Sequence, residues 1–210
     1  MFTKAILPDT LRALKLVSKI DIVKKSYLAG GTALALHLGH RISEDLDFFT
    51  QQELDEKILL NELKRLSEFV EEGTAWRTVW GKVGKTKFSL FYYEYPLLKK
   101  TINFDGIQIL QKEDIAAMKI HAIGDRGTKR DFFDLYFLAK EFPLEQVLKF
   151  YDQKYGKSEN NLYHIIRSLN YFIDAEIDKD PKMFIKTSWK EVKDFFQKEA
   201  TRLAKKRYKI

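Results

Sequence analysis

Two short motifs near the N-terminus most constrain what this chain can fold into. A short apolar segment ends at Gly30-Gly31, and after 13 further residues a second apolar segment contains Asp45 and Asp47. In a strand, residues two apart point to the same side, about 7 Å apart along the chain. A core strand has no use for two such carboxylates, so the pattern predicts that a positive group lies between them.

Hydrophobic periodicity predicts a strand, a helix and a second strand around these motifs. Residues 26–29 are short and apolar, which indicates a buried strand. A helix is expected from Thr32 or Ala33 to about Leu38, where Gly39 ends it. The alternation of acidic and apolar residues over 45–49 predicts the second strand.

The rest of the chain divides into two halves near residue 111. Before this point we expect an opening helix, a helix over residues 58–66, strands over 74–80 and 86–93 joined by a hairpin at "GKVGK", and a strand over 107–110. After it, apolar residues recur at helical spacing. The predicted fold class is α+β, with a mixed sheet and helices in residues 1–111 and a mostly helical half in residues 112–210.

The residue types in the two motifs suit phosphate and metal chemistry. Asp45 and Asp47 are able to hold a pair of Mg²⁺ ions, which act about 3.5–4 Å apart on the attacking and leaving oxygens of a phosphoryl transfer. Gly30 and Gly31 let backbone N–H groups approach a phosphate, and Thr32 opens a helix whose positive end favours an anion. Taken singly, each motif has a structural explanation. Asp45 and Asp47 also suit an edge strand that faces water, and two glycines between a strand and a helix are common for steric reasons.

The spacing of the glycine pair and the acid pair resembles the signature of the polymerase-β-type nucleotidyltransferases. More narrowly, "GGTALALHLGHRISEDLDFF" is similar to the AbiEii/AbiGii nucleotidyltransferase-like toxins of bacterial toxin–antitoxin and phage-defence systems. The resemblance implies a nucleotidyltransferase fold that moves NMP from an NTP to an acceptor hydroxyl and releases pyrophosphate. It also implies a cognate antitoxin, typically encoded beside the toxin, which need not touch it.

A second informative segment is "EDIAAMKIHAIGDRGTKRDFFDLYFL", residues 113–138. Near a helix N-terminus, Asp131 and Asp134 are also simply favourable to the helix. The family resemblance extends over this segment and implies three roles. Lys119 contacts nucleotide phosphates, and Asp131 or Asp134 orients that lysine or acts as general base. The basic residues of the intervening loop bind phosphate or an acceptor strand; these are Arg126, Lys129 and Arg130.

Enzymes of this fold usually carry a third carboxylate on a later strand. In the predicted strand over residues 86–93, Ser89 or Leu90 stands where the acid is expected, and Glu94 is the nearest acid. Two arrangements are therefore open. The metal site rests on Asp45 and Asp47 alone, or it also uses Asp131 or Asp134.

Charge and composition indicate the partners. The formal net charge is +7, and residues 186–210 hold nine Lys/Arg against three acids, a net of +6. Such a cluster suits a phosphate backbone, although a solvated helix face explains it as well. With the toxin resemblance it favours RNA, and tRNA first, as acceptor. Zero cysteines and the absence of a long apolar run favour a cytoplasmic protein with no membrane contact.

Two other functions use the same motifs. The first is nucleotidylation of a small molecule or of a protein side chain, for which the basic tail is incidental. The second is a nucleotide- or RNA-binding module that kept the glycine turn and lost catalysis.

Overall fold

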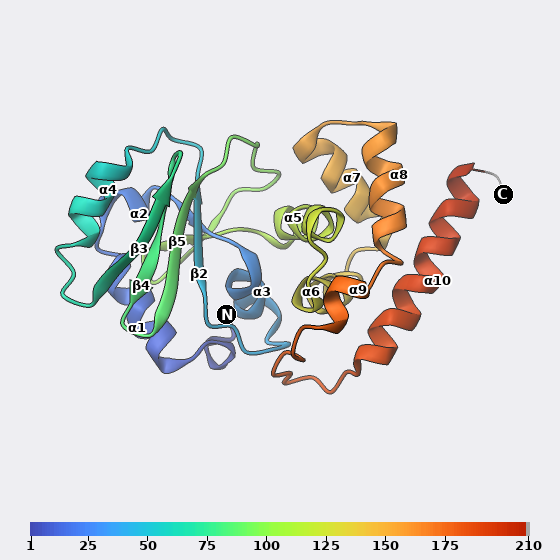
Figure 1. Cartoon of the computed structure of the whole chain (residues 1–210), viewed down its shortest axis with the longest axis horizontal. Coiled ribbons are helices and arrows are strands. Elements are labelled where there is room, and N and C mark those ends of the chain that lie inside the picture. Colours follow the sequence, from blue (N-terminus) through green and yellow to red (C-terminus); the bar gives the residue numbers. More distant parts are fainter. Residues whose placement is uncertain (209–210) are drawn as a thin grey trace. The chain divides into compact units, whose positions relative to one another are not determined.

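The computed structural model describes residues 1–208 of the chain, which form two compact units (Figure 1). The first unit, Met1–Gln111, is a mixed sheet with helices. The second unit, from Lys112 onward, is built from helices. This arrangement confirms the predicted fold class.

In the described residues the sheet has seven strands in the order β3-β4-β5-β2-β1-β7-β6. β2 pairs antiparallel with β1 and parallel with β5, and β1 pairs parallel with β7. The strand that contains Asp47 therefore lies inside the sheet. The strands are β1 (Tyr27–Leu28), β2 (Leu46–Thr50), β3 (Phe69–Ala75), β4 (Thr78–Val83), β5 (Thr86–Tyr92), β6 (Ile102–Phe104) and β7 (Ile107–Ile109).

Short helices cover the sheet of the first unit. α1 contacts β5, α3 contacts β2 and α4 contacts β4. α3 begins at Gly30, two or three residues before the predicted start, and ends at Leu38 with Gly39 as its cap, as predicted. Gly39 has φ +62°, and its N–H donates to the carbonyl oxygen of Ala35 over 2.8 Å. The helices are η1 (Thr3–Ala5), α1 (Pro8–Val17), α2 (Asp21–Lys24), α3 (Gly30–Leu38) and α4 (Glu56–Leu63).

Side chains alternate between the two faces of the central strands. On one face, Leu46 and Phe48 of β2 and Phe88 and Leu90 of β5 are fully buried. The residues between them are half-buried, so the opposite face of these strands is partly open. This alternation is what a sheet with one core face produces.

The prediction of one continuous strand over residues 74–80 is wrong. The chain turns at Trp76-Arg77, where Arg77 has φ +50°, and β4 begins only at Thr78. The predicted turn "GKVGK" contains two different glycines. Gly81 lies inside β4, where a Cβ would collide with the carbonyl oxygen of Val70, and Gly84 has φ +60° in the two-residue loop before β5.

The edge strand β3 carries a β-bulge. Its pairing with β4 skips Glu72, between Glu71 and Gly73. The Glu72 carboxylate forms an ion pair of 2.6 Å with Lys82 of β4. The bulge therefore fixes an acidic residue at the edge of the sheet.

The second unit packs its helices around aromatic side chains. The ring centroid of Phe132 lies 5.1 Å from that of Phe172 and 5.3 Å from that of Phe196, and Phe133 stacks on Trp189 at 5.8 Å. In the part of the chain that the structure describes, every helix is too short or too polar to span a membrane. The helices of the second unit are α5 (Lys112–Asp125), α6 (Lys129–Leu138), α7 (Leu144–Tyr155), α8 (Glu159–Ser168), α9 (Ile173–Glu176) and α10 (Trp189–Tyr208).

A fully buried ion pair joins α5 to α7. Lys154 Nζ lies 2.8 Å from Asp114 Oδ1, and neither side chain is exposed to solvent. Removing one partner of such a pair leaves the other charge buried and uncompensated, whereas replacing both with apolar residues avoids that cost.

We expect Lys154→Met to lower the free energy of unfolding of the helical unit by about 3–5 kcal/mol. The double variant Asp114→Leu/Lys154→Met should recover most of this loss. Urea unfolding followed by circular dichroism measures both. Lys190→Met, which removes the exposed pair Lys190–Asp194, is the matched control and should change the unfolding free energy by less than about 1 kcal/mol. A loss of this small size for Lys154→Met would contradict the prediction.

Candidate active site

The glycine turn lies directly against the second aspartate. Gly30 has φ +64°, and a Cβ at this position would lie 3.3 Å from Asp47 Oδ2. The N–H of Ala29 donates to the carbonyl oxygen of Asp47 over 2.9 Å, which ties the turn to β2. The left-handed backbone favours glycine here, and the nearby carboxylate leaves little room for a Cβ.

The two aspartates occupy the open side of β2. Asp45 comes immediately before the strand and Asp47 is its second residue. Both are half-buried, while Leu46 and Phe48 between and beside them are fully buried on the other side. The apolar residues therefore anchor the strand, and the carboxylates belong to the face that the core does not use.

Thr32 reaches the acidic motif through its side chain. Its buried hydroxyl donates to the carbonyl oxygen of Asp45 and lies 2.9 Å from Ser43 Oγ. The sequence predicts Thr32 as a phosphate ligand, whereas the structure shows that its hydroxyl joins the first turn of α3 to the backbone of Asp45. Its place in that turn still leaves its backbone N–H suited to an anion.

Sequence reasoning missed Arg41, a buried cation beside the glycine turn. A Cβ at Gly31 would collide with the guanidinium of Arg41, so the absence of a side chain at Gly31 is what admits it. Arg41 Nη1 also donates to the carbonyl oxygen of Ile42 over 3.0 Å. A lone arginine in "GHRISED" gives no local sign of burial, because only the fold brings it to Gly31.

The structure places Ser89 where the third carboxylate is expected. Asp47 of β2 pairs in parallel register with Ser89 of β5. Glu94 is exposed and follows Tyr92, the last residue of β5. Among the residues that the structure describes, no group of three His, Cys, Asp or Glu side chains forms a metal site. The two carboxylates still fit Mg²⁺, which proteins usually bind through one or two carboxylates together with substrate phosphates and water.

Lys119 is held between two aspartates in the second unit. Its Nζ lies 2.8 Å from Asp131 Oδ1 and 2.7 Å from Asp134 Oδ2, and both aspartate side chains are buried. Thr128, the N-cap of α6, donates from its hydroxyl to Asp131 Oδ2 over 2.6 Å. Three residues that the sequence predicts for one site are therefore one cluster, in which Lys119 already has two counter-charges.

The electrostatics of this cluster keep Asp131 ionised. Burial by itself raises the pKa of Asp131, but the charges of Lys119 and Arg126 and the hydrogen bonds from Lys119 and Thr128 lower it to about 2. Arg126 reaches Asp131 Oδ2 through Nε over 3.2 Å while most of its side chain stays exposed.

The three basic residues predicted to bind phosphate lie in different environments. Arg126 and Arg130 are exposed. Lys129 is buried; its ammonium donates to the carbonyl oxygen of Asp178 over 2.6 Å and pairs with Asp180 at 3.0 Å. The Lys129 side chain thus holds α6 against the segment after α9. Of these three residues, Arg126 and Arg130 stay candidates for acceptor contacts.

Comparison with known proteins identifies the family. Residues 18–208 match the family described as nucleotidyl transferase AbiEii toxin of type IV toxin–antitoxin systems. The chain belongs to the AbiEii nucleotidyltransferase toxin family. An uncharacterised protein of Aquifex aeolicus strain VF5 is 37% identical to it over 195 residues, which cover 89% of this chain and 92% of that protein.

Solved structures share the fold of this AbiEii family member. MenT4, a nucleotidyltransferase toxin of Mycobacterium tuberculosis H37Rv, is 16% identical with a TM-score of 0.60 and covers 92% of this chain and 82% of its own. JHP933 from Helicobacter pylori is 22% identical with a TM-score of 0.51 and covers 97% of each chain. The predicted family is confirmed, and the protein is a nucleotidyltransferase.

The basic tail of this AbiEii protein is largely paired within the helical unit. The buried residues Val192, Phe196, Ala200 and Leu203 place α10 in the core. Ion pairs with acids of the same unit are formed by Lys190, Lys193, Arg202, Lys206 and Arg207. Hydrogen bonds from Arg202 lower the pKa of Glu145 to about 2. Exposed cations remain at Lys186, Lys198 and Lys205, and Lys209 lies outside the described residues.

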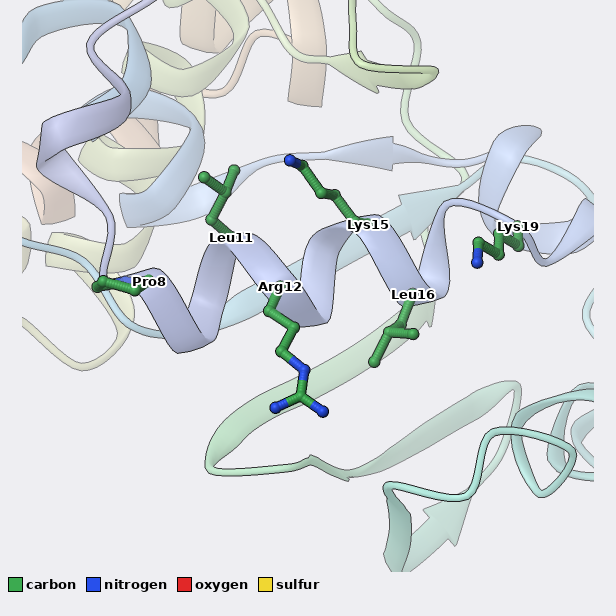
Figure 2. A pocket seen from close by; sticks show the side chains of 6 residues that line it. All are labelled: Pro8, Leu11, Arg12, Lys15, Leu16 and Lys19. Atoms are coloured by element: carbon green, nitrogen blue, oxygen red, sulfur yellow. The ribbon is translucent and has the colours of Figure 1, made fainter.

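Two surface hollows lie away from the glycine turn. A groove of about 480 Å³ runs along α1, where Leu11 and Lys15 point to one side and Arg12 and Leu16 to the other (Figure 2). Arg12 is paired with Glu68 at 2.5 Å. In the helical unit, a cleft of about 730 Å³ is lined in part by Arg126. Of the predicted site residues, only Arg126 lines either hollow.

The low pKa of Asp131 gives a pH-dependent prediction. A pKa of about 2 in the folded protein against an ordinary value of 3.8 corresponds to about 2 kcal/mol of stability. Because the pKa is lowered, this contribution is complete above about pH 4 and is lost as the pH falls toward 2. Asp131→Asn should therefore destabilise the protein most at neutral pH, and the difference from the wild type should shrink below about pH 4.

Denaturant unfolding at neutral pH, about pH 4 and about pH 3 measures this difference. Asp125→Asn changes an exposed acid of the same segment and should have little effect at each pH. If the loss caused by Asp131→Asn stayed constant down to about pH 3, the low pKa of Asp131 would be refuted.

Proposed function

We propose that this protein transfers an NMP from an NTP to a hydroxyl of RNA, with tRNA as the first candidate, using Mg²⁺ and releasing pyrophosphate. The observation that carries the proposal is the contact between the two halves of the motif. The glycine turn that suits a triphosphate lies against Asp47, the carboxylate that suits its metal ions.

The first unit supplies phosphate and metal binding. Backbone N–H groups at Gly31 and Thr32 would receive the triphosphate at the start of α3, with the buried guanidinium of Arg41 as a nearby positive charge. Asp45 and Asp47 would hold two Mg²⁺ ions, which when bound stabilise charge on the attacking and leaving oxygens. The hydroxyl of Thr32 keeps the Asp45 backbone in place for this role.

The second unit supplies a fixed cation. The family resemblance assigns Lys119 to the nucleotide phosphates. Within the second unit, its two aspartate partners keep its ammonium in one position. A general base works best with a pKa near the working pH. Because the pKa of Asp131 is about 2, we assign Asp131 to orienting Lys119 and leave proton transfer to Asp134 or to solvent.

Membership of a toxin family supports RNA as the acceptor, as do the exposed cations Arg126 and Arg130. An antitoxin encoded beside the gene would then limit the damage without having to bind this protein. The proposed activity belongs in the cytoplasm, where NTPs and tRNA are present.

The test is transfer of α-³²P label from each of the four NTPs into total RNA. We expect labelled RNA with Mg²⁺ and a loss of roughly 10³-fold in the double variant Asp45→Asn/Asp47→Asn, since metal ions contribute several kcal/mol to such reactions. Glu44→Gln removes an exposed neighbouring acid and should leave the activity within about two-fold.

Two outcomes would overturn the proposal. Label in protein or in small molecules, with none in RNA, would establish the same chemistry on another acceptor. No transfer from any NTP by a folded protein that still binds NTP would establish a binding module. Deleting residues 186–210 does not serve as a test of the basic tail, because α10 contributes core residues.

A further inference from the structure

We propose that the open face of the sheet beyond Asp47 is a stacking surface for the terminal base of the acceptor RNA. This inference rests on the proposed function. It assigns the acceptor to Trp80, Ser89 and Phe91, with Lys87 for the phosphate that precedes the terminal nucleotide.

Strand register builds this surface from three neighbouring strands. Asp47 of β2 pairs with Ser89 of β5, and Ser89 pairs with Trp80 of β4. Two residues further on, Phe49 of β2 pairs with Phe91 of β5. Paired residues point to the same side of a sheet, so the carboxylate, the hydroxyl and the aromatic rings share one face.

The aromatic rings on this face are ordered and partly open. Phe49 and Phe91 stack with ring centroids 5.1 Å apart and an angle of 29° between the rings. Both are half-buried, as is Trp80, while the other face of the same strands is fully buried. Rings that are already fixed lose little conformational freedom when a base stacks on them, which favours binding.

The position of the glycine turn decides which nucleotide uses this surface. Gly30 lies against Asp47 from the β1 side of β2, so a triphosphate on the turn approaches from that side. β5 and β4 lie on the other side of β2. The reacting acceptor hydroxyl must lie across the metal pair from the leaving pyrophosphate, because the displacement is in line. The acceptor therefore lies over β5 and β4.

Ser89 leaves room for a ligand between the carboxylate and the indole. Adjacent strands are about 4.8 Å apart, so the backbone positions of Asp47 and Trp80 are separated by about 10 Å. The indole of Trp80 leans over the edge strand, where a Cβ at Gly73 would collide with it. A ribose near Asp47 and Ser89 would thus have an aromatic surface within reach for its base.

A cation stands on the same face where the strands begin. Lys87 precedes Phe88, the partner of Leu46, and is exposed. Its cross-strand neighbour Lys82 is neutralised by Glu72 at 2.6 Å. Of these two lysines, Lys87 is therefore the better phosphate ligand. Proteins bind single-stranded nucleic acid by stacking bases on aromatic rings and placing cations at the phosphates.

The experiment measures binding of a short fluorescein-labelled single-stranded RNA by anisotropy in Mg²⁺. Phe91→Leu should weaken binding roughly 5- to 100-fold, the range that loss of one stacked base gives. Phe91→Trp keeps a ring and should bind as the wild type does. Trp76→Leu removes an exposed aromatic residue from the turn between β3 and β4 and is the matched control.

The lysine is tested by salt dependence. Lys87→Gln should weaken RNA binding and lower the slope of log affinity against log salt by about 0.7, the value for one phosphate contact on a single strand. Lys85→Gln changes an exposed lysine two residues away in the hairpin loop and should leave the slope unchanged.

Several results would overturn the inference. The first is unchanged RNA binding by Phe91→Leu. The second is an equal loss of RNA affinity in Trp76→Leu. The third is a raised KM for NTP in Phe91→Leu with unchanged RNA affinity, which would assign the surface to the base of the incoming nucleotide. Failure of the proposed function is separate from these. If Phe91→Leu weakens RNA binding but no label is transferred by the wild type, the stacking surface is supported and the proposed reaction is refuted. If Phe91→Leu transfers label as well as the wild type does, the reaction is supported and the stacking surface is refuted.

Discussion

The close contact between Gly30 and Asp47 is the constraint on which the candidate site depends. The left-handed backbone at Gly30 lets the chain leave β1, pass beside the carboxylate and enter α3 within one residue. The hydroxyl of Thr32 and the carbonyl of Asp45 then fix the other end of the contact. The acid motif and the phosphate turn are held together by backbone geometry, so the arrangement exists before any ligand binds.

In the second unit, ion pairs hold the candidate site residues in place. Lys119 lies between Asp131 and Asp134, and Arg126 offsets the excess negative charge from the exposed side. The same rule applies along α10, where acids of the helical unit pair with much of the basic segment. Part of the positive charge that the sequence shows in this segment is thus paired with acids of its own unit. Affinity for RNA is then expected to come from a few exposed cations together with stacking.

The sequence predicted the features that depend on local pattern. The order of strand, helix and strand around Gly30 and Asp47 follows from periodicity and glycine placement, and the family motif lies within it. The features it did not predict depend on contacts between distant segments. Gly81 and Gly84 look alike in "GKVGK", and only the neighbouring Val70 shows that the first belongs to a strand. Likewise, the burial of Lys129 depends on Asp178 and Asp180, some fifty residues away.

The bulge at Glu72 has a consequence for how the protein behaves when it is abundant. An edge strand offers unpaired backbone groups to any other strand, which is a common route to aggregation. β3 interrupts its own ladder at Glu72, next to Glu71, and the two carboxylates are held in ion pairs with Lys82 and Lys64. A second chain that tried to extend the sheet there would meet a broken register and charged side chains that are already paired. This edge is thereby protected against the growth of intermolecular β-sheet.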